Sequence, residues 1–386
     1  MTPPLGLYIH WPFCVSKCPY CDFNSHVRNR IDEDAWQKAL LDELRFVCTQ
    51  TKGRALSTVF FGGGTPSLMN PRTVDALLNA LSTYWQISND LEITLEANPG
   101  SVDLGRFKDY RQAGVTRLSL GVQSLHDDAL HFLGRKHNRE EALKALDVTK
   151  QVFDRFSFDL IYARPGQTLD AWEKELEEAL PLAGGHLSLY QLTIEPGTAF
   201  YQQHARGDWH LPPEDVAADM YERTRTLLAD HGLYDYEISN YAAPGQECQH
   251  NLLYWRTHDY LGIGPGAHGR LTRDGIRFET RCLKAPETWL TQVSTLGQGQ
   301  QECTPLSAKD VFEETLLMGL RLKEGVFLDT LRAYDERATQ KLLSSKAIQT
   351  LVTESLLVPL TSKDTHLKAT SAGRQRLNAL LSYILS

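Results

Sequence analysis

The sequence predicts an α/β fold in which a parallel sheet curls into most of a barrel and a smaller, mainly helical domain follows. Short apolar runs alternate with amphipathic stretches through residue 230. Repeated strand–helix units of this kind build a parallel sheet with helices outside. From Ser307 onward helical patterns dominate. We therefore expect a barrel over residues 1–235, a connecting segment over 236–300 and a helical domain over 301–386.

Six runs rich in β-branched and aromatic residues are the expected barrel strands: Leu5–Trp11, Thr58–Phe61, Leu91–Ala97, Thr116–Val122, Phe156–Tyr162 and His186–Thr193. Between them, apolar residues three to four positions apart predict helices: Asp34–Cys48, Pro71–Thr83, Val102–Gln112, Arg139–Gln151 and Leu169–Leu182. Asp32 and Thr168 are the expected N-caps of two of these helices. Six such units favour a curled sheet over a flat one.

In the second half of the chain the alternation of strand and helix patterns stops. Tyr234–Tyr241 predicts a strand, and residues 242–269 are rich in turn formers. Lys309–Leu322 and Arg337–Glu354 are the clearest later helices. Leu356–Leu385 predicts two short strands and a helix, which resembles a winged helix. We expect that module to pack or to act as a lid rather than to bind DNA.

Composition narrows the classes of partner. The 386 residues carry a formal net charge of −8, which argues against nucleic acid or an anionic membrane as an electrostatically driven partner. No apolar run approaches the ~18 residues that a membrane span needs, and the first residues lack the features of a signal peptide. Thiols without a secretory signal indicate a reducing compartment. We expect a cytoplasmic protein with no membrane span.

Cys14, Cys18 and Cys21 lie together directly after the first expected strand. A loop this short can place three thiolates on three irons of a cubane cluster and leaves the fourth iron open for an outside ligand. A zinc site is the alternative, with a fourth ligand from His10, His26 or another chain. A disulfide is disfavoured because the seven cysteines are odd in number. The other cysteines resemble buried small hydrophobic residues, with Cys248 as a possible exception: Cys48, Cys248, Cys282 and Cys303.

Polar residues recur where the expected strands end, the edge at which barrel enzymes place their active sites. A glycine run follows the second strand, Glu96 and Gln123 lie at the ends of the next two, and the fifth strand carries Asp159. Glycines let backbone approach a ligand and offer N–H donors. The three polar side chains would hold the hydroxyls and amine of a cofactor, and Arg135 would pair with a carboxylate. The plainer alternatives are a tight turn, a solvated cap and a surface arginine.

These motifs together resemble a known family. The C-x3-C-x2-C loop, with Tyr20 before its last cysteine, resembles that of radical S-adenosylmethionine (SAM) proteins. Gly62–Pro66 is similar to the motif with which they bind the methionine amine. Three further strings resemble the oxygen-independent coproporphyrinogen III oxidase branch: Tyr8–Cys14, Gly121–Ser124 and Asp159–Tyr162. The similarity to this branch covers nearly the whole chain.

The resemblance implies a partial (β/α)6 barrel that holds a [4Fe–4S] cluster on Cys14, Cys18 and Cys21. It implies that SAM chelates the open iron, and that an electron from the cluster splits SAM into methionine and a 5′-deoxyadenosyl radical. The residues that the resemblance assigns to the SAM pocket are Tyr8, Tyr20, Gly63, Gly64, Thr65, Glu96, Gln123, Arg135 and Asp159.

A second motif, from His250 to Trp255, matches the H-N-x-x-Y-W signature of the haem-chaperone branch of this family. A neutral imidazole is a common axial ligand of haem iron, and Tyr254 and Trp255 would cover a porphyrin face. The alternative is a structural histidine beside two core aromatics. Cys248 does not form the C-x-x-C-H of c-type attachment, so covalent linkage stays open.

Two departures argue against porphyrinogen decarboxylation. Phe23 occupies the position of a further cysteine in the decarboxylase pattern, and the long N-terminal extension of that enzyme is missing. We expect a haem-binding protein that passes haem to acceptor haemoproteins, with a homodimer implied by resemblance. The alternatives are a radical SAM enzyme acting on a tetrapyrrole and a zinc-stabilised scaffold.

Overall fold

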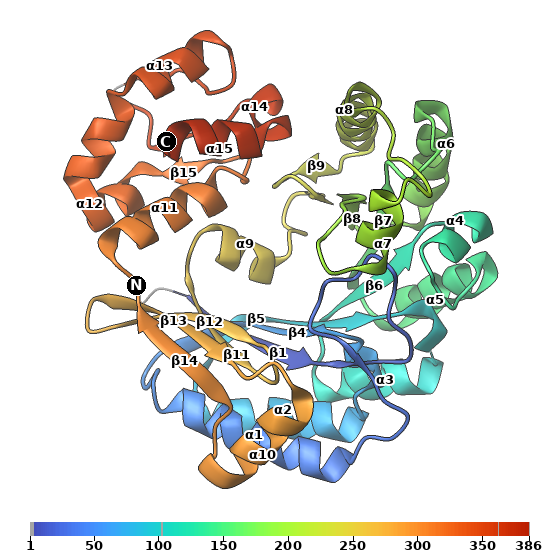
Figure 1. Ribbon diagram of the computed structural model, residues 1–386. Helices are drawn as coiled ribbons and strands as arrows, with labels where there is room; N and C mark the ends of the chain where they lie inside the picture. Colours follow the sequence, from blue (N-terminus) through green and yellow to red (C-terminus); the bar gives the residue numbers. More distant parts are fainter. Residues whose placement is uncertain (1–3, 102, 362, 386) are drawn as a thin grey trace.

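The computed structural model describes residues 4–101, 103–361 and 363–385. In these residues one sheet of twelve strands dominates, in the order β14-β13-β12-β11-β1-β4-β5-β6-β7-β8-β10-β9 (Figure 1). Its middle consists of six neighbouring parallel strands, which confirm the six expected: β1 (Leu5–Trp11), β4 (Ala55–Gly63), β5 (Gln86–Ala97), β6 (Arg117–Gln123), β7 (Arg155–Tyr162) and β8 (His186–Gln191).

The barrel is open, because β1 pairs with the parallel strand β11 (Asp259–Ile263) rather than with β8. An antiparallel meander continues from β11 through β12 (His268–Arg273), β13 (Ile276–Cys282) and β14 (Gln300–Pro305). Part of the segment expected to connect two domains therefore extends the sheet. At the other edge, the single strand expected over Tyr234–Tyr241 is a hairpin of β9 (Tyr234–Asp235) and β10 (Asn240–Ala242). Tyr236 to Ser239 turn the chain between them.

Helices on the outside of the sheet cover its convex face (Figure 1). The expected helices are confirmed, and Asp32 and Thr168 cap them by accepting hydrogen bonds from Ala35 and Ala171. Residue 102, the expected first residue of one helix, lies outside the described residues. The helices are α1 (Glu33–Cys48), α2 (Pro71–Tyr84), α3 (Leu104–Ala113), α5 (Arg139–Val152) and α6 (Leu169–Ala179), with the unexpected α4 (Asp127–Phe132), α7 (Ala199–Ala205), α8 (Glu214–Asp230) and α10 (Pro286–Leu296), and short 3-10 turns at Pro66–Leu68, Pro99–Ser101 and Leu180–Leu182.

One helix, α9 (Gln249–Trp255), lies on the concave face of the sheet instead (Figure 1). A side chain at Gly6 of β1 would reach within 3.1 Å of Leu253, so α9 packs directly against the strand. This region was expected to be turn-rich. The helix forms because Leu252 and Leu253 find buried positions against the sheet.

The C-terminal residues build a second core around Leu316, Leu331 and Leu367. Its elements are α11 (Ala308–Gly319), α12 (Leu328–Leu343), α13 (Lys346–Thr353), α14 (Ser371–Gln375), α15 (Leu377–Leu385) and the ribbon of β15 (Val326–Phe327) with β16 (His366–Leu367). The helix expected over Arg337–Glu354 is divided, because Ser345 caps a new helix by accepting from Ile348. None of the described helices is long and apolar enough to cross a membrane.

Candidate functional site

The cysteine loop is held at both ends beside the C-terminal end of β1. It begins in the short strand β2 (Phe13–Cys14) and ends in β3 (His26–Val27), and these two strands pair in parallel. Cys14, Cys18 and Cys21 are all half-buried free thiols. The loop is therefore a fixed feature of the barrel mouth, as the sequence predicts.

Each thiol has a polar neighbour. The Thr65 hydroxyl donates to Cys14 Sγ at 3.4 Å, and Arg135 Nη1 donates to Cys18 Sγ at 3.5 Å. Cys21 Sγ lies 3.8 Å from the Ser25 hydroxyl. Burial raises the pKa of the Cys14 and Cys21 thiols, while the hydroxyl neighbours oppose that rise. Donors aimed at sulfur favour the thiolate, which is the form that binds metal.

The glycine run serves a packing role that the sequence did not show. Gly63 has φ +113°, and a Cβ there would lie 2.6 Å from the His10 ring. A Cβ on Gly64 would lie 2.7 Å from the Phe13 carbonyl oxygen and 3.0 Å from Cys14 Sγ. Close approach of backbone is indeed why glycine is needed. In the described structure, however, Gly63 approaches the His10 ring of β1, and Gly64 approaches β2, the strand that carries Cys14.

Arg135 is not a surface residue but ties the cysteine loop to two barrel strands. Its Nη2 donates to Asn98 Oδ1 at 2.5 Å and to the Gly121 carbonyl oxygen at 2.7 Å. Asn98 in turn donates to Thr65 Oγ1 at 3.0 Å. Sequence reasoning did not assign Asn98, although its place directly after β5, at the same edge as Glu96, is the signal that would have found it.

Two carboxyl groups face the barrel interior from β5 and β7. Burial, reinforced by the charge of Asp159, raises the pKa of Glu96 to about 8. Burial raises the pKa of Asp159 to about 7. Gln123 has φ +73°, and its buried Oε1 has no partner among the described residues, like Oδ1 of Asp159. Unpartnered buried acceptors and a strained backbone point to a ligand.

Two tyrosines complete the predicted pocket. Tyr8 faces the interior from β1, and its hydroxyl hydrogen-bonds His10 Nδ1 at 3.0 Å. His10 is the side chain beside Gly63, so Tyr8 joins the glycine turn through it. Tyr20 packs against Phe200 with ring centroids 6.2 Å apart. The predicted pocket residues therefore gather around one mouth.

The donor set fits the cofactors that the sequence implies. Among the described residues no three histidine, cysteine or carboxylate side chains converge as ligands of one metal ion would. A cubane presents its irons at separate corners, so three thiolates that bind it need not converge. Three thiols on one loop suit such a cluster. The open acceptors of Gln123 and Asp159 suit a polar ligand beside it.

His250, the predicted haem ligand, is enclosed in the barrel. The residue is 1 % exposed, and its Nδ1 shares a 2.8 Å hydrogen bond with Thr58 Oγ1. The ring stacks on Phe60 at 5.1 Å. Burial lowers the pKa of His250 to about 3, so the imidazole is neutral. Its Nε2 has no described partner, and the assignment as a haem ligand stays a prediction.

The neighbours of His250 are also engaged with protein. Tyr254 lies edge-on to His250 at 4.8 Å, and the Trp255 ring lies under the Arg321 guanidinium at 4.4 Å. Cys248 is fully buried, and burial raises the pKa of its thiol to about 12, so it is a poor nucleophile. Cys303 is exposed, contrary to expectation, because it lies on the edge strand β14.

Comparison with known proteins places this geometry in a family. Residues 8–179 match the Radical SAM superfamily. The chain is 44 % identical to the haem chaperone HemW of Escherichia coli (strain K12), over 75 % of this chain and 76 % of that protein. It is 39 % identical to the mitochondrial radical S-adenosyl methionine domain-containing protein 1 of Mus musculus, over 92 % of this chain and 81 % of that protein.

The solved structure of coproporphyrinogen III oxidase (HemN) from Escherichia coli, a radical SAM enzyme, shares the fold. Its TM-score is 0.82 at 22 % identity, and the match covers 99 % of this chain and 90 % of that one. The likeness extends through the C-terminal elements, since nearly all of the chain is covered. Membership of the family implies a [4Fe–4S] cluster and SAM. The chain belongs to the radical SAM superfamily, within its group of HemW-like proteins.

Proposed function

We propose that the protein is a haem chaperone, which binds haem and passes it to acceptor haemoproteins while it carries a [4Fe–4S] cluster with SAM on the open iron. The observation that carries this proposal is the 44 % identity to the haem chaperone HemW over three quarters of the chain. The His250–Trp255 motif on α9 supports it, because it matches the signature of that branch.

In this proposal the barrel mouth is the cofactor site. Cys14, Cys18 and Cys21 hold the cluster, and Arg135 fixes the loop that carries them. When bound, the cluster supplies a low-potential electron to SAM. Glu96 and Asp159, once ionised, attract the positive charge of SAM. The residues proposed to line its pocket are Tyr8, Tyr20, Gly63, Gly64, Thr65, Glu96, Gln123, Arg135 and Asp159.

A haem titration tests the proposal. Anaerobically reconstituted full-length protein is titrated with ferric haem, and the loaded protein is then mixed with an apo-haemoprotein. The proposal predicts saturable binding of about one haem per chain and transfer to the acceptor. Free haem at the same concentration is the control for passive transfer. Failure of the cluster-loaded protein to bind haem would contradict the proposal.

The competing function is a radical SAM enzyme that acts on a tetrapyrrole. It predicts loss of propionate carboxyls from coproporphyrinogen together with release of 5′-deoxyadenosine under reducing conditions. Detection of both products, stoichiometric over several turnovers, would replace the chaperone proposal. We also propose a cytoplasmic homodimer. The relatives include bacterial and mitochondrial proteins, and sedimentation of the cluster-loaded protein would test the dimer.

A further inference from the structure

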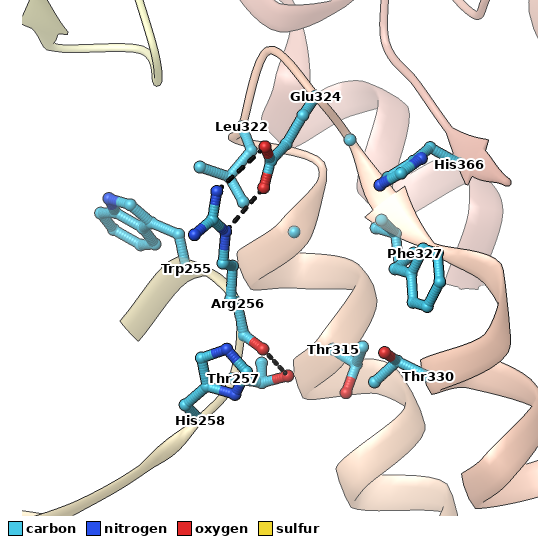
Figure 2. Close-up of a pocket in the computed structure, with 13 residues that line it drawn as sticks. Trp255, Arg256, Thr257, His258, Thr315, Leu322, Glu324, Phe327, Thr330 and His366 are labelled. Carbon is cyan, nitrogen blue, oxygen red and sulfur yellow. Dashed lines mark hydrogen bonds and ion pairs between the residues drawn. The ribbon is translucent and has the colours of Figure 1, made fainter. Parts of the chain in front are cut away.

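A cavity of about 340 Å³ opens where the end of α9 meets the C-terminal elements (Figure 2). His258, on its wall, directly precedes Asp259, which pairs with Leu5, the first residue of β1. The cysteine loop follows Trp11 at the opposite end of that strand. At about 3.3 Å per residue, the cavity and the loop are separated by roughly 20 Å along β1.

The cavity has an apolar floor and an exposed aromatic wall. Leu322 and Val326 form the floor and are 1 % and 2 % exposed. Phe327 is 43 % exposed, although it is a large apolar residue, and its ring lies 5.1 Å from that of His366. Trp255 turns its indole away from the cavity (Figure 2). The free aromatic surface is therefore that of Phe327 and the histidines.

Two imidazoles stand on opposite sides of this space (Figure 2). His366 Nδ1 shares a 2.8 Å hydrogen bond with Thr365 Oγ1. When Nδ1 donates that bond, Nε2 carries a free lone pair, the arrangement usual for metal-ligating histidines. No hydrogen bond joins the His258 ring to any described residue. Burial lowers the pKa of His258, which favours the neutral form of this imidazole.

The rim of the cavity carries the Arg256 guanidinium, which pairs with Glu324 and can also pair with a ligand. Arg256 Nε and Nη2 donate to the Glu324 carboxylate at 2.7 and 3.1 Å. The side chains of this pair are 41 % and 43 % exposed. Exposed pairs of this kind contribute little to stability, so a ligand carboxylate can compete with Glu324 for the guanidinium.

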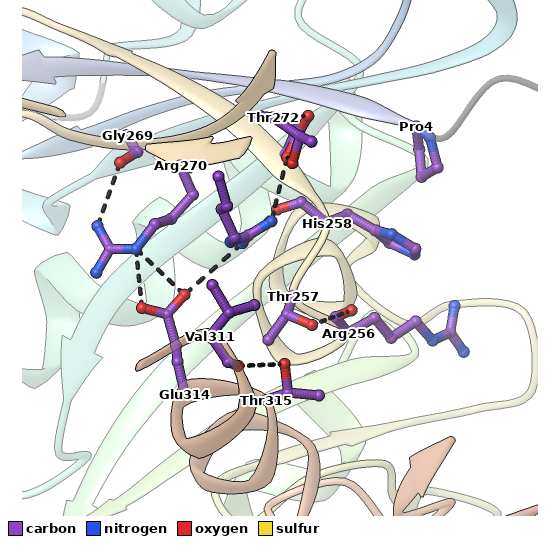
Figure 3. Close-up of polar contacts among 12 residues, drawn as sticks. Pro4, Arg256, Thr257, His258, Gly269, Arg270, Thr272, Val311, Glu314 and Thr315 are labelled. Carbon is purple, nitrogen blue, oxygen red and sulfur yellow. Dashed lines mark hydrogen bonds and ion pairs between the residues drawn. The ribbon is translucent and has the colours of Figure 1, made fainter. Parts of the chain in front are cut away.

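The walls behind the cavity are fixed by polar contacts (Figure 3). Arg270 of β12 donates to Glu314 of α11 at 2.9 Å, which joins the barrel sheet to the C-terminal elements. Thr315 donates to the Val311 carbonyl oxygen at 2.7 Å within α11. The Arg270–Glu314 contact thus holds β12 against α11, the helix that supplies Thr315 and Gly319 to the cavity wall.

We propose that this cavity, rather than His250, takes the haem, with His366 as the axial ligand, His258 on the opposite side and Arg256 facing a propionate. The proposal rests on the proposed function and gives that function its binding site. The cavity, at about 340 Å³, lies at the lower end of the ~300–1,000 Å³ range of ligand sites. A site this small would enclose part of a porphyrin and leave one edge in solvent. Partial cover suits a cargo that must leave.

The same geometry gives the α9 motif a positioning role. His250 anchors the first turn of α9 to Thr58 of β4, and the helix then delivers Arg256 to the cavity rim. A positioning residue changes affinity without changing the metal's ligand field. We therefore expect His250→Ala to leave the absorption spectrum of bound haem like that of the parent.

The test is a ferric haem titration of full-length, cluster-loaded protein, followed by absorption and electron paramagnetic resonance. His366→Ala should shift the Soret band and weaken binding by about tenfold, the loss of one coordinating contact. His366→Gln, which keeps a polar side chain, should show the same spectral change. His210→Ala, which removes an exposed histidine elsewhere, is the matched control.

The outcomes separate the two proposals. If the parent binds no haem, the proposed function fails. If the parent binds haem and its spectrum and affinity survive His366→Ala, His258→Ala and Arg256→Gln, the cavity is not the site and the function stands. If His250→Ala alone changes the spectrum, the ligand is on the inner face of α9 and the cavity proposal is overturned.

Discussion

The two ends of β1 are built in different ways. At the C-terminal end, Arg135 makes three polar contacts and Thr65 two, so the side chains that meet the cysteine loop are held in place. At the N-terminal end, His366 and His258 keep ring nitrogens without described partners, and the large apolar side chain of Phe327 is exposed. Side chains that are fixed by hydrogen bonds suit a permanently bound cofactor, and side chains without partners suit a ligand that is bound and released.

We call the C-terminal end of β1, with the cysteine loop, the cofactor end, and the N-terminal end, with the cavity, the cargo end. The largest expected effect is a loss of function at the cofactor end alone. Cys18→Ser should abolish cluster assembly, because two thiolates hold a cubane poorly. Iron and sulfide should fall from about four per chain to near zero after anaerobic reconstitution. Cys303→Ser removes an exposed thiol on β14, the edge strand that β13, β12 and β11 separate from β1, and should leave both contents unchanged. Equal iron in Cys18→Ser and parent would remove the cluster assignment.

A second substitution should lower the stability of the C-terminal elements that form the cargo end, without affecting the cofactor end. Asp235 faces Arg225 Nε at 3.2 Å, Lys323 Nζ at 3.1 Å and Arg374, and so joins β9 to the C-terminal elements. Asp235→Ala leaves these cations without their buried partner, which should lower the free energy of unfolding by about 3–5 kcal/mol. Urea denaturation measures this.

The matched control for Asp235 is Asp329→Ala, whose carboxylate is 65 % exposed and pairs with Arg332 on the surface. It should change the free energy of unfolding by less than about 1 kcal/mol. Iron content after reconstitution should be normal in both variants. If Asp235→Ala lost iron as well as stability, while Asp329→Ala kept both, the two ends of β1 would not be independent.

Arg135→Ala should weaken the cofactor end to a smaller degree than loss of a cysteine. It leaves Asn98 Oδ1 and the Gly121 carbonyl oxygen without their donor, which should cost about 2–4 kcal/mol of unfolding free energy and reduce cluster occupancy. Arg139→Ala breaks only an exposed pair with Glu178 and serves as the control. Full occupancy in Arg135→Ala would deny this arginine its role in fixing the loop.

The smallest expected effect is a pH dependence of SAM binding. The pKa values of about 7 for Asp159 and about 8 for Glu96 mean that both carboxyls ionise between pH 6 and 9. SAM affinity should rise over that range by about tenfold, equivalent to ~1.4 kcal/mol. Calorimetry at each pH measures it, and Glu96→Gln should remove the upper part of the rise. A flat profile in the parent would exclude both carboxyls from the pocket.

The same carboxyls set the sign of a stability change in the unliganded protein. Their pKa values lie above the ordinary range, so the folded state binds more protons than the unfolded state as the pH passes from 4 to 8. Stability from these groups is therefore full at low pH and declines as the pH rises through 8. Glu96→Gln should reduce that decline.

The cofactor end could be predicted from sequence because its information is local. Cys14, Cys18 and Cys21 lie in one loop, and Glu96, Gln123 and Asp159 each end or lie near the end of a strand whose apolar period is plain. Parallel strands bring such residues to one edge. What sequence could not provide was why Gly63 is glycine, since the His10 ring beside it lies on another strand.

The cargo end could not be predicted because it exists only after distant segments meet. Arg256, Phe327 and His366 come from three separate elements, and each is ordinary in its own stretch of sequence. The turn-rich composition of residues 242–269 also concealed α9, whose helical form depends on burial against β1. His250 was predicted as a ligand from its motif and the resemblance of the whole chain, and its enclosure follows from that same burial.

One measurement tests the separation of the two ends most directly: iron–sulfide content and haem spectrum of Cys18→Ser and His366→Ala, taken side by side with the parent. The account predicts that Cys18→Ser loses its iron and sulfide yet binds haem with the parent's spectrum. It predicts that His366→Ala keeps four irons and changes the haem spectrum. Loss of haem binding in Cys18→Ser, with a normal spectrum in His366→Ala, would contradict it.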